Sequence, residues 1–225
     1  MRREIVDYRG FRLTKINEPR FSHLKLLLGW VGYFILYLLT ENLIAPEDCH
    51  PVHCRLDDWI PFNEWFVIAY VGWYLLIVFS LGYFLFINVE NFKGLQTYII
   101  VTQVIAMAIY ILYPTRQDLR PVEFPRDNIL TDLIGIIYSA DTNTGVCPSL
   151  HVAYSFGIAS AWLKEKSASS FVKLLVVIAV ILICLSTMFI KQHSAVDFFA
   201  ALPVCVIAEA IAFRSFRGQK RMNRN

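Results

Sequence analysis

Long apolar segments alternate with short polar segments along most of the chain. Six of them carry almost no charge, at residues 24–44, 62–87, 95–113, 148–163, 171–190 and 194–213. About 20 apolar residues make one helix that crosses a bilayer. The hydrocarbon region accepts only helices and closed barrels, and these segments are much longer than barrel strands. The pattern therefore predicts an all-α fold, a six-transmembrane-helix bundle.

Composition supports an integral membrane protein. The chain has 225 residues, of which 56% are hydrophobic and 17% charged. We expect three parts, a basic N-terminal tail (1–23), the membrane domain (24–214) and a basic C-terminal tail (215–225). Residues 1–23 lack the apolar segment and cleavage site of a removable signal peptide. The basic residues are scattered and no nucleic-acid-binding motif accompanies them, so a nucleic-acid partner is not expected.

The distribution of Lys and Arg predicts the orientation of the bundle. Sixteen of the 21 lie on the side of the two tails, which six spans place together. The opposite side has five, namely Arg55, Arg116, Arg120, Arg126 and Lys191. Cytoplasmic loops carry the excess of positive charge. We therefore expect both termini in the cytoplasm, with the polar loops facing outward from a membrane that we take to be the bacterial cytoplasmic membrane.

Two polar motifs at the ends of apolar segments are the candidate chemistry. The segment 191–197 reads Lys-Gln-His-Ser-Ala-Val-Asp, so His193 and Asp197 are four residues apart. On a helix they share a face, and the carboxylate can orient the imidazole. The segment 148–151 reads Pro-Ser-Leu-His. A proline suits the first turn of a helix, whose free N–H groups attract an anion.

Together these residues indicate phosphoryl transfer. His193 would be the nucleophile and His151 the acid and then the base. We expect the phosphate to be held by Ser149 and Leu150 in the first helical turn and by nearby cations. The candidate cations are Arg120, Lys191 and Arg116. Each residue taken alone has a simpler interpretation, such as a hydrogen bond at a helix end, a local cap or a headgroup anchor.

Two further segments receive interpretations. The loop 114–147 is long, and its apolar part, Ile129–Tyr138, is interpreted either as a helix on the membrane surface or as a plain amphipathic connector. Cys49 and Cys54 are a candidate disulfide on the outer face. The alternative is a metal site that also uses His50 and His53. The remaining cysteines are interpreted as core packing (Cys184, Cys205) and pocket lining (Cys147).

The motifs resemble those of the type 2 phosphatidic acid phosphatase (PAP2) superfamily. Pro148–His151 resembles its Pro-Ser-x-His motif, and His193-x3-Asp197 resembles the end of Ser-Arg-x5-His-x3-Asp. Arg120-Pro121 resembles the Arg-Pro that closes Lys-x6-Arg-Pro. Leu150 resembles the branch of inositol phosphorylceramide synthases and related bacterial proteins. The resemblance implies a six-helix membrane enzyme that needs no metal or cofactor and forms a phosphohistidine on His193.

Two positions depart from the PAP2 motifs. Tyr113 stands where the first motif has Lys, and Thr187 stands where the third has Arg, whereas Ser186 matches. Arg116 and Lys191 are the candidate replacements.

Three functions remain open on the sequence. The first is a lipid phosphatase that acts on a phospholipid or polyprenyl (di)phosphate at the outer leaflet. The second is a phosphotransferase to an alcohol, and the third is a non-catalytic phospholipid-binding protein. The expected partners are the bilayer and a lipid phosphate, and the sequence leaves the lipid and the oligomeric state open.

Overall fold

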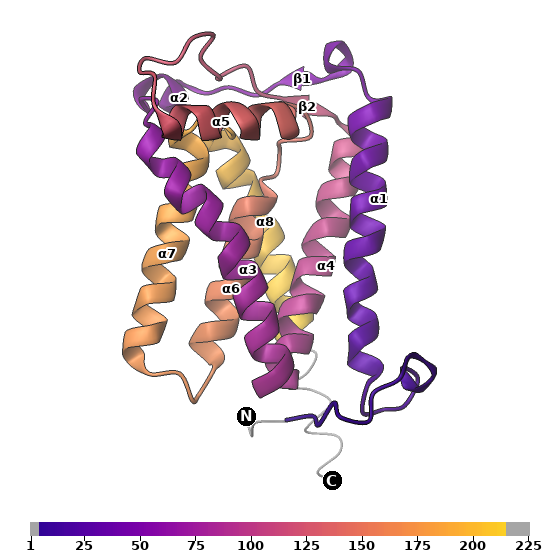
Figure 1. Cartoon of the computed structure of the whole chain (residues 1–225). Helices are drawn as coiled ribbons and strands as arrows, with labels where there is room; N and C mark the ends of the chain where they lie inside the picture. The colour runs from indigo at the N-terminus through magenta and orange to yellow at the C-terminus, as the bar shows by residue number, and fades with distance from the viewer. Residues whose placement is uncertain (1–4, 215–225) are drawn as a thin grey trace.

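The computed structural model describes residues 5–214, which form a helical bundle (Figure 1). Six helices run along it, namely α1 (Leu28–Leu43), α3 (Val67–Ile87), α4 (Val89–Leu112), α6 (Leu150–Lys164), α7 (Ser170–Phe189) and α8 (Ala195–Glu209). Two shorter helices, α2 (Arg55–Trp59) and α5 (Ile129–Ala140), lie at one end. Short helical turns directly adjoin three of the long helices, namely η2 (Ser22–Leu27) before α1, η4 (Glu64–Phe66) before α3 and the π-helical η5 (Ala210–Arg214) after α8. Two more, η1 (Leu13–Lys15) and η3 (Pro46–Asp48), lie in the segments between.

The all-α membrane architecture is confirmed. Five helical segments of residues 5–214 are long and apolar enough to cross a bilayer: Ser22–Leu43, Glu64–Ile87, Val89–Leu112, Ser170–Phe189 and Ala195–Phe213. Helix α6 has 15 residues, or about 22 Å at 1.5 Å per residue, which is shorter than the hydrocarbon core. It nevertheless packs inside the bundle against α4, α7 and α8.

Helix α4 begins at Val89, six residues before the predicted start of the third apolar segment at residue 95. The prediction was wrong because the polar residues before 95 are buried by specific partners. Asn88 caps the helix, and the carboxylate of Glu165 accepts hydrogen bonds from the amides of Asn88 (2.7 Å) and Asn91 (2.9 Å). A buried polar group is tolerated when it is hydrogen-bonded, so this network allows the helix to start earlier.

Helices α4 and α6 approach each other closely at a glycine. A Cβ atom at Gly157 would lie 2.5 Å from the ring of Tyr98, which is nearer than a side chain tolerates. The glycine therefore permits α6 to lie this close to α4.

Of the two interpretations of the apolar part of the long loop, the structure has the helical one. Helix α5 covers the predicted Ile129–Tyr138 and lies across the end of the bundle (Figure 1). An unpredicted pair of two-residue strands lies at the same end, where β1 (His50–Pro51) pairs in parallel with β2 (Thr115–Arg116). This pairing ties the loop between α1 and α3 to the segment that precedes α5.

The predicted disulfide is not formed, because Cys49 and Cys54 are both free. The thiol of Cys49 donates to the carbonyl of Ala45, whereas the side chain of Cys54 caps the N-terminus of α2. The alternative metal site is not assembled either: His50 stacks on Tyr113, and His53 pairs with an aspartate. Within residues 5–214 no three or more His, Cys, Asp or Glu side chains are grouped to hold a metal ion.

The N-terminal segment contacts the bundle at Tyr8, Phe21 and His23, whereas most residues from 9 to 20 are exposed. The hydroxyl of Tyr8 donates to the carbonyl of Leu85 at 3.0 Å, and Phe21 and His23 are buried. This segment was expected only as a basic tail. The predicted C-terminal tail, residues 215–225, lies outside the described residues.

Candidate active site

The two histidine motifs meet at the end of the bundle that carries α2 and α5. Helix α7 stops at Phe189 and Lys191 adopts a left-handed conformation with φ 55°, which turns the chain. The N–H groups of Gln192 and His193 both donate to the carbonyl of Thr187, at 2.9 and 3.0 Å. This tight turn holds His193 just before α8.

Asp197 contacts the imidazole of His193, but not on the shared helical face that their spacing predicted, because His193 lies before the N-cap of α8. Its Oδ2 lies 3.1 Å from Nδ1 of His193 and accepts a hydrogen bond from the N–H of Ser194 at 2.9 Å. The hydroxyl of Ser194 in turn caps α8. With the Nδ1 proton directed at Asp197, the lone pair of His193 lies on Nε2.

His151 lies on the other side of His193. Its Nδ1 is 3.3 Å from Nε2 of His193, although the two residues are 42 positions apart. Its ring packs against Tyr70 and Trp73, with centroid distances of 4.7 and 4.2 Å. These two rings fix the orientation of His151, so a proton donor or acceptor is held next to the candidate nucleophile.

Ser149 and Leu150 join the start of α6 to this arrangement. The N–H of Ser149 donates to the carbonyl of Asp197 at 3.1 Å, and its hydroxyl caps α6 by accepting from Val152. Leu150 lines the cavity beside the histidines. The hydroxyl of Ser149 is thus engaged in capping.

Arg120 is bound to main-chain oxygens. Its two terminal nitrogens donate to the carbonyls of Tyr138, Asp141 and Thr142 at 2.8–3.1 Å, where α5 ends. One of them also donates to Oε1 of Gln192 at 2.6 Å. Burial lowers the pKa of this guanidinium from its ordinary value. Arg120 therefore reaches the site through Gln192, the residue before His193.

The other two predicted cations are held by carbonyls away from the histidines. The ammonium of Lys191 donates to the carbonyls of Asp57 (3.1 Å) and Ile60 (2.5 Å) at the end of α2. Burial lowers its pKa from the ordinary value. The guanidinium of Arg116 donates to the carbonyl of Pro46 at 2.7 Å. Neither side chain lines the cavity that contains the histidines.

Two cavities that share lining residues lie beside His151, and one of them is also lined by His193. The smaller, which we call the histidine cavity, has a volume of about 60 Å³ and is bordered by His151, His193, Gln192 and Asp141. The larger, the aromatic chamber, has about 660 Å³ and lies between α1, α3, α5 and α6. Both are lined by Tyr33, Tyr37, Asp141, Leu150 and His151. The shared lining makes the chamber an apolar extension of the polar site.

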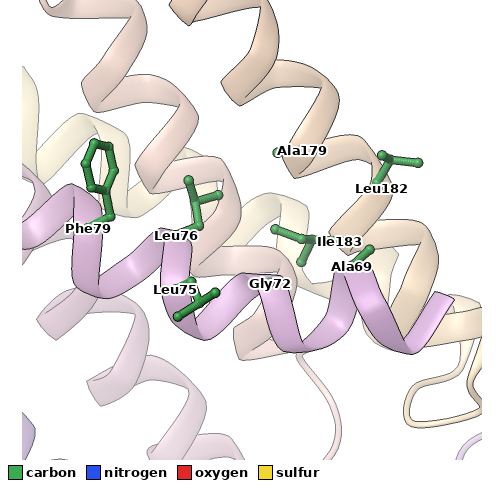
Figure 2. A pocket seen from close by; sticks show the side chains of 8 residues that line it. All are labelled: Ala69, Gly72, Leu75, Leu76, Phe79, Ala179, Leu182 and Ile183. Carbon is green, nitrogen blue, oxygen red and sulfur yellow. The ribbon is translucent and has the colours of Figure 1, made fainter. Parts of the chain in front are cut away.

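A further apolar cavity of about 380 Å³ lies between α3 and α7 (Figure 2). Its eight lining residues are all apolar, and they include Gly72, Phe79 and Ile183. None of them belongs to the predicted site. The aromatic chamber, by contrast, is lined by His151.

Sequence reasoning missed Asp57, Asp141 and Gln192. Asp57 is 4% exposed, and its carboxylate accepts from the hydroxyl of Ser194 and the N–H of Ala195. Burial alone would raise the pKa of Asp57, but these hydrogen bonds outweigh it and hold the pKa below 3.8. No spacing in the sequence relates Asp57 to residue 194. Gln192 could have been found from the sequence, because it is a polar residue directly before His193 and therefore lies in the same turn.

Cys147 is placed beside Asp197, near the predicted pocket. Burial, together with the charge of Asp197 and a hydrogen bond to it, raises the pKa of Cys147 to about 12. The thiol is therefore protonated at neutral pH, and a protonated thiol is a poor nucleophile.

One curated protein is similar to part of this chain. Over 68 residues the chain is 43% identical to a PA-phosphatase related-family protein of Dictyostelium discoideum. The match covers 30% of this chain and 12% of that protein's length. No protein-family model and no solved structure matches the chain. The similarity supports a phosphatase-family membrane protein, with PAP2 as the superfamily that it favours.

Proposed function

We propose that this chain is a membrane-embedded phosphatase of the PAP2 type, which hydrolyses a phosphate ester or diphosphate of a lipid. One observation carries the proposal. His151, His193 and Asp197 form a continuous series of contacts of 3.3 and 3.1 Å that opens on a cavity next to a larger apolar chamber. A reactive phosphate and an apolar lipid chain need such adjoining spaces.

The contacts support a two-step reaction. Nε2 of His193 attacks phosphorus, the ester P–O bond breaks, and the departing oxygen takes a proton from His151. Water then attacks the phosphohistidine, His151 accepts its proton, and phosphate leaves with His193 restored. Asp197 stabilises the imidazolium character of His193 throughout. The scheme uses side chains of the chain for every proton transfer.

We also propose the topology predicted by the charge distribution. Helix α6 would cross the bilayer together with the five longer helices, which gives six spans. Both tails would then lie in the cytoplasm of a bacterial cell, and the histidines would face outward. Helix α1 supports sideways entry of the lipid, because it forms one wall of the aromatic chamber and has no buried residue.

The engagement of the three cations favours a second candidate, a protein that binds a lipid phosphate without turnover. Arg120, Lys191 and Arg116 all donate to main-chain carbonyls. Phosphoryl transfer is usually accelerated by cations at the transferred group. A site with few free cations would be slow, or would hold its ligand unchanged.

The experiment is phosphate release by the full chain in detergent with EDTA present. The substrates are phosphatidic acid, lysophosphatidic acid, and farnesyl and undecaprenyl diphosphates, and the control is His193→Ala. We expect release that survives EDTA, disappears in His193→Ala and leaves a trapped phosphohistidine in the wild type. Equal release by the variant would refute the proposal.

Two other results separate the alternatives. Transfer of a labelled phosphate group to an added alcohol, in preference to water, would identify a phosphotransferase. Saturable binding with no turnover of any of these lipids would identify the non-catalytic protein.

A further inference from the structure

The fixed charge that lines the two cavities is negative. Apart from the two histidines, Asp141 is the only charged side chain among the described residues that line them. A second carboxylate, Glu41 of α1, accepts from the hydroxyl of the lining residue Thr142 at 2.6 Å. The guanidinium of Arg120 lies near enough to offset part of the Asp141 charge electrostatically, but its side chain lines neither cavity. A site for a plain phosphate anion would be expected to show the opposite sign.

The carboxylate of Asp141 is held where the cavities join. Its Oδ1 accepts from the hydroxyl of Tyr37 at 2.8 Å, and its Oδ2 accepts from the amide of Gln192 at 3.0 Å. A carboxylate has about four acceptor positions, so these two donors leave capacity for another. Because Gln192 directly precedes His193, the carboxylate and the nucleophile are held by the same turn.

Aromatic rings border the same junction. Tyr33 and Tyr37 line both cavities and lie with ring centroids 6.0 Å apart, and Trp73 and Tyr74 line the chamber. Ring faces attract a cation, and several rings beside one carboxylate form the kind of cage that binds ammonium groups.

We propose that the site takes a lipid phosphate ester that carries an ammonium group, which sits between the Asp141 carboxylate and the faces of Tyr33, Tyr37 and Tyr74. This inference rests on the proposed function. The ammonium offsets the negative lining, the phosphate faces His193, and the chain occupies the aromatic chamber. The ammonium belongs either to the headgroup of a phosphodiester or to the backbone of a single-chain phosphate monoester.

The test is binding rather than turnover, in the His193→Ala background, so that its failure is distinguishable from failure of the proposed reaction. Dissociation constants would be measured in detergent for phosphatidylethanolamine against phosphatidylglycerol, and for an amino-alkyl phosphate monoester against lysophosphatidic acid. The two pairs distinguish the two sources of the ammonium. We expect the ammonium-bearing member of at least one pair to bind tenfold or more tightly than its partner.

Asp141→Asn is expected to remove this preference without weakening binding of the ammonium-free lipids. Asp118→Asn is the matched control, because that aspartate lies in the same loop and pairs with Arg116 on the surface. Tyr74→Leu is a second variant for the case in which Asp141→Asn does not fold, and it should reduce the preference severalfold. Equal binding within both pairs, or an unchanged preference in a folded Asp141→Asn or Tyr74→Leu protein, would overturn the inference.

Discussion

The carboxylate of Asp57 accepts a hydrogen bond of 2.6 Å from the hydroxyl of Ser194, across 137 residues of sequence. It also accepts from the N–H of Ala195 at 2.7 Å, while its own carbonyl accepts from Lys191. Helix α2 therefore holds both sides of His193. This contact helps the turn between α7 and α8 to keep one geometry.

Asp57→Asn should weaken both the fold and the proposed reaction. The new amide has one oxygen, so its NH2 group would face either the hydroxyl of Ser194 or the N–H of Ala195, and that hydrogen bond would be lost. We expect this loss to lower the unfolding free energy by about 2–3 kcal/mol, because the network is buried and charged. We expect kcat to fall more than KM rises, because the turn around His193 loosens. Asp58→Asn is the control, since Asp58 is exposed and pairs with His53. Equal stability of the two variants would contradict the role of Asp57.

The same contact should be visible in the pH dependence of stability. Hydrogen bonds hold the folded-state pKa of Asp57 below its ordinary value. The stabilisation that the ionised carboxylate contributes to the fold is therefore present above the unfolded-state pKa and is lost as pH falls through the folded-state pKa. The difference in unfolding free energy between wild type and Asp57→Asn should be full at pH 7 and should shrink below about pH 4. Thermal unfolding in detergent at several pH values measures it. A difference that is constant down to pH 3 would argue against the linkage.

Asp197→Asn should reduce the proposed turnover by about 10²–10⁴ with little change in KM. The amide no longer fixes the tautomer of His193 or stabilises its positive charge. The measurement is steady-state phosphate release on the best substrate of the panel, with circular dichroism to check the fold, because Asp197 also accepts from Ser194 at the start of α8. Activity within a factor of two of wild type would contradict this role.

Arg120→Lys distinguishes a phosphate ligand from a positioning residue. The structure places its guanidinium on three carbonyls and on Gln192. We therefore expect kcat to fall about tenfold or more while KM changes little, since a lysine cannot reproduce the fork of donors. Arg126→Lys, in the same loop and paired with Glu64, is the control. A large rise in KM at constant kcat would instead indicate direct phosphate binding.

Cys147 should resist alkylation although it lies beside the site. With a pKa of about 12, about one thiol in 10⁴ is ionised at pH 8. Both Cys54 and Cys147 are partly exposed, but iodoacetamide labelling followed by mass spectrometry should modify Cys54 well before Cys147. Cys147→Ser should retain turnover. Rapid labelling of Cys147 with loss of activity would show that the thiol takes part in the reaction.

The sequence by itself determined the membrane class, the approximate helices and the pairing of His193 with Asp197. These features depend on local properties, namely the length of apolar segments, a spacing of four residues and the caps of helices. For residues 129–138 the apolar pattern made a helix one of two interpretations, and a helix is present. The start of α4 was placed six residues late, because its polar first turn is buried against the carboxylate of Glu165, which is distant in the sequence.

Only the tertiary structure decided which charges belong to the site. Arg120, Lys191 and Arg116 are cations in the right loops, but a sequence does not reveal that main-chain carbonyls at the ends of α5 and α2 and at Pro46 already engage them. It equally does not reveal that Asp57 and Asp141 approach residues 192–195 from distant segments. Such contacts depend on the packing of helices far apart in the chain, and packing, unlike periodicity, leaves no local pattern.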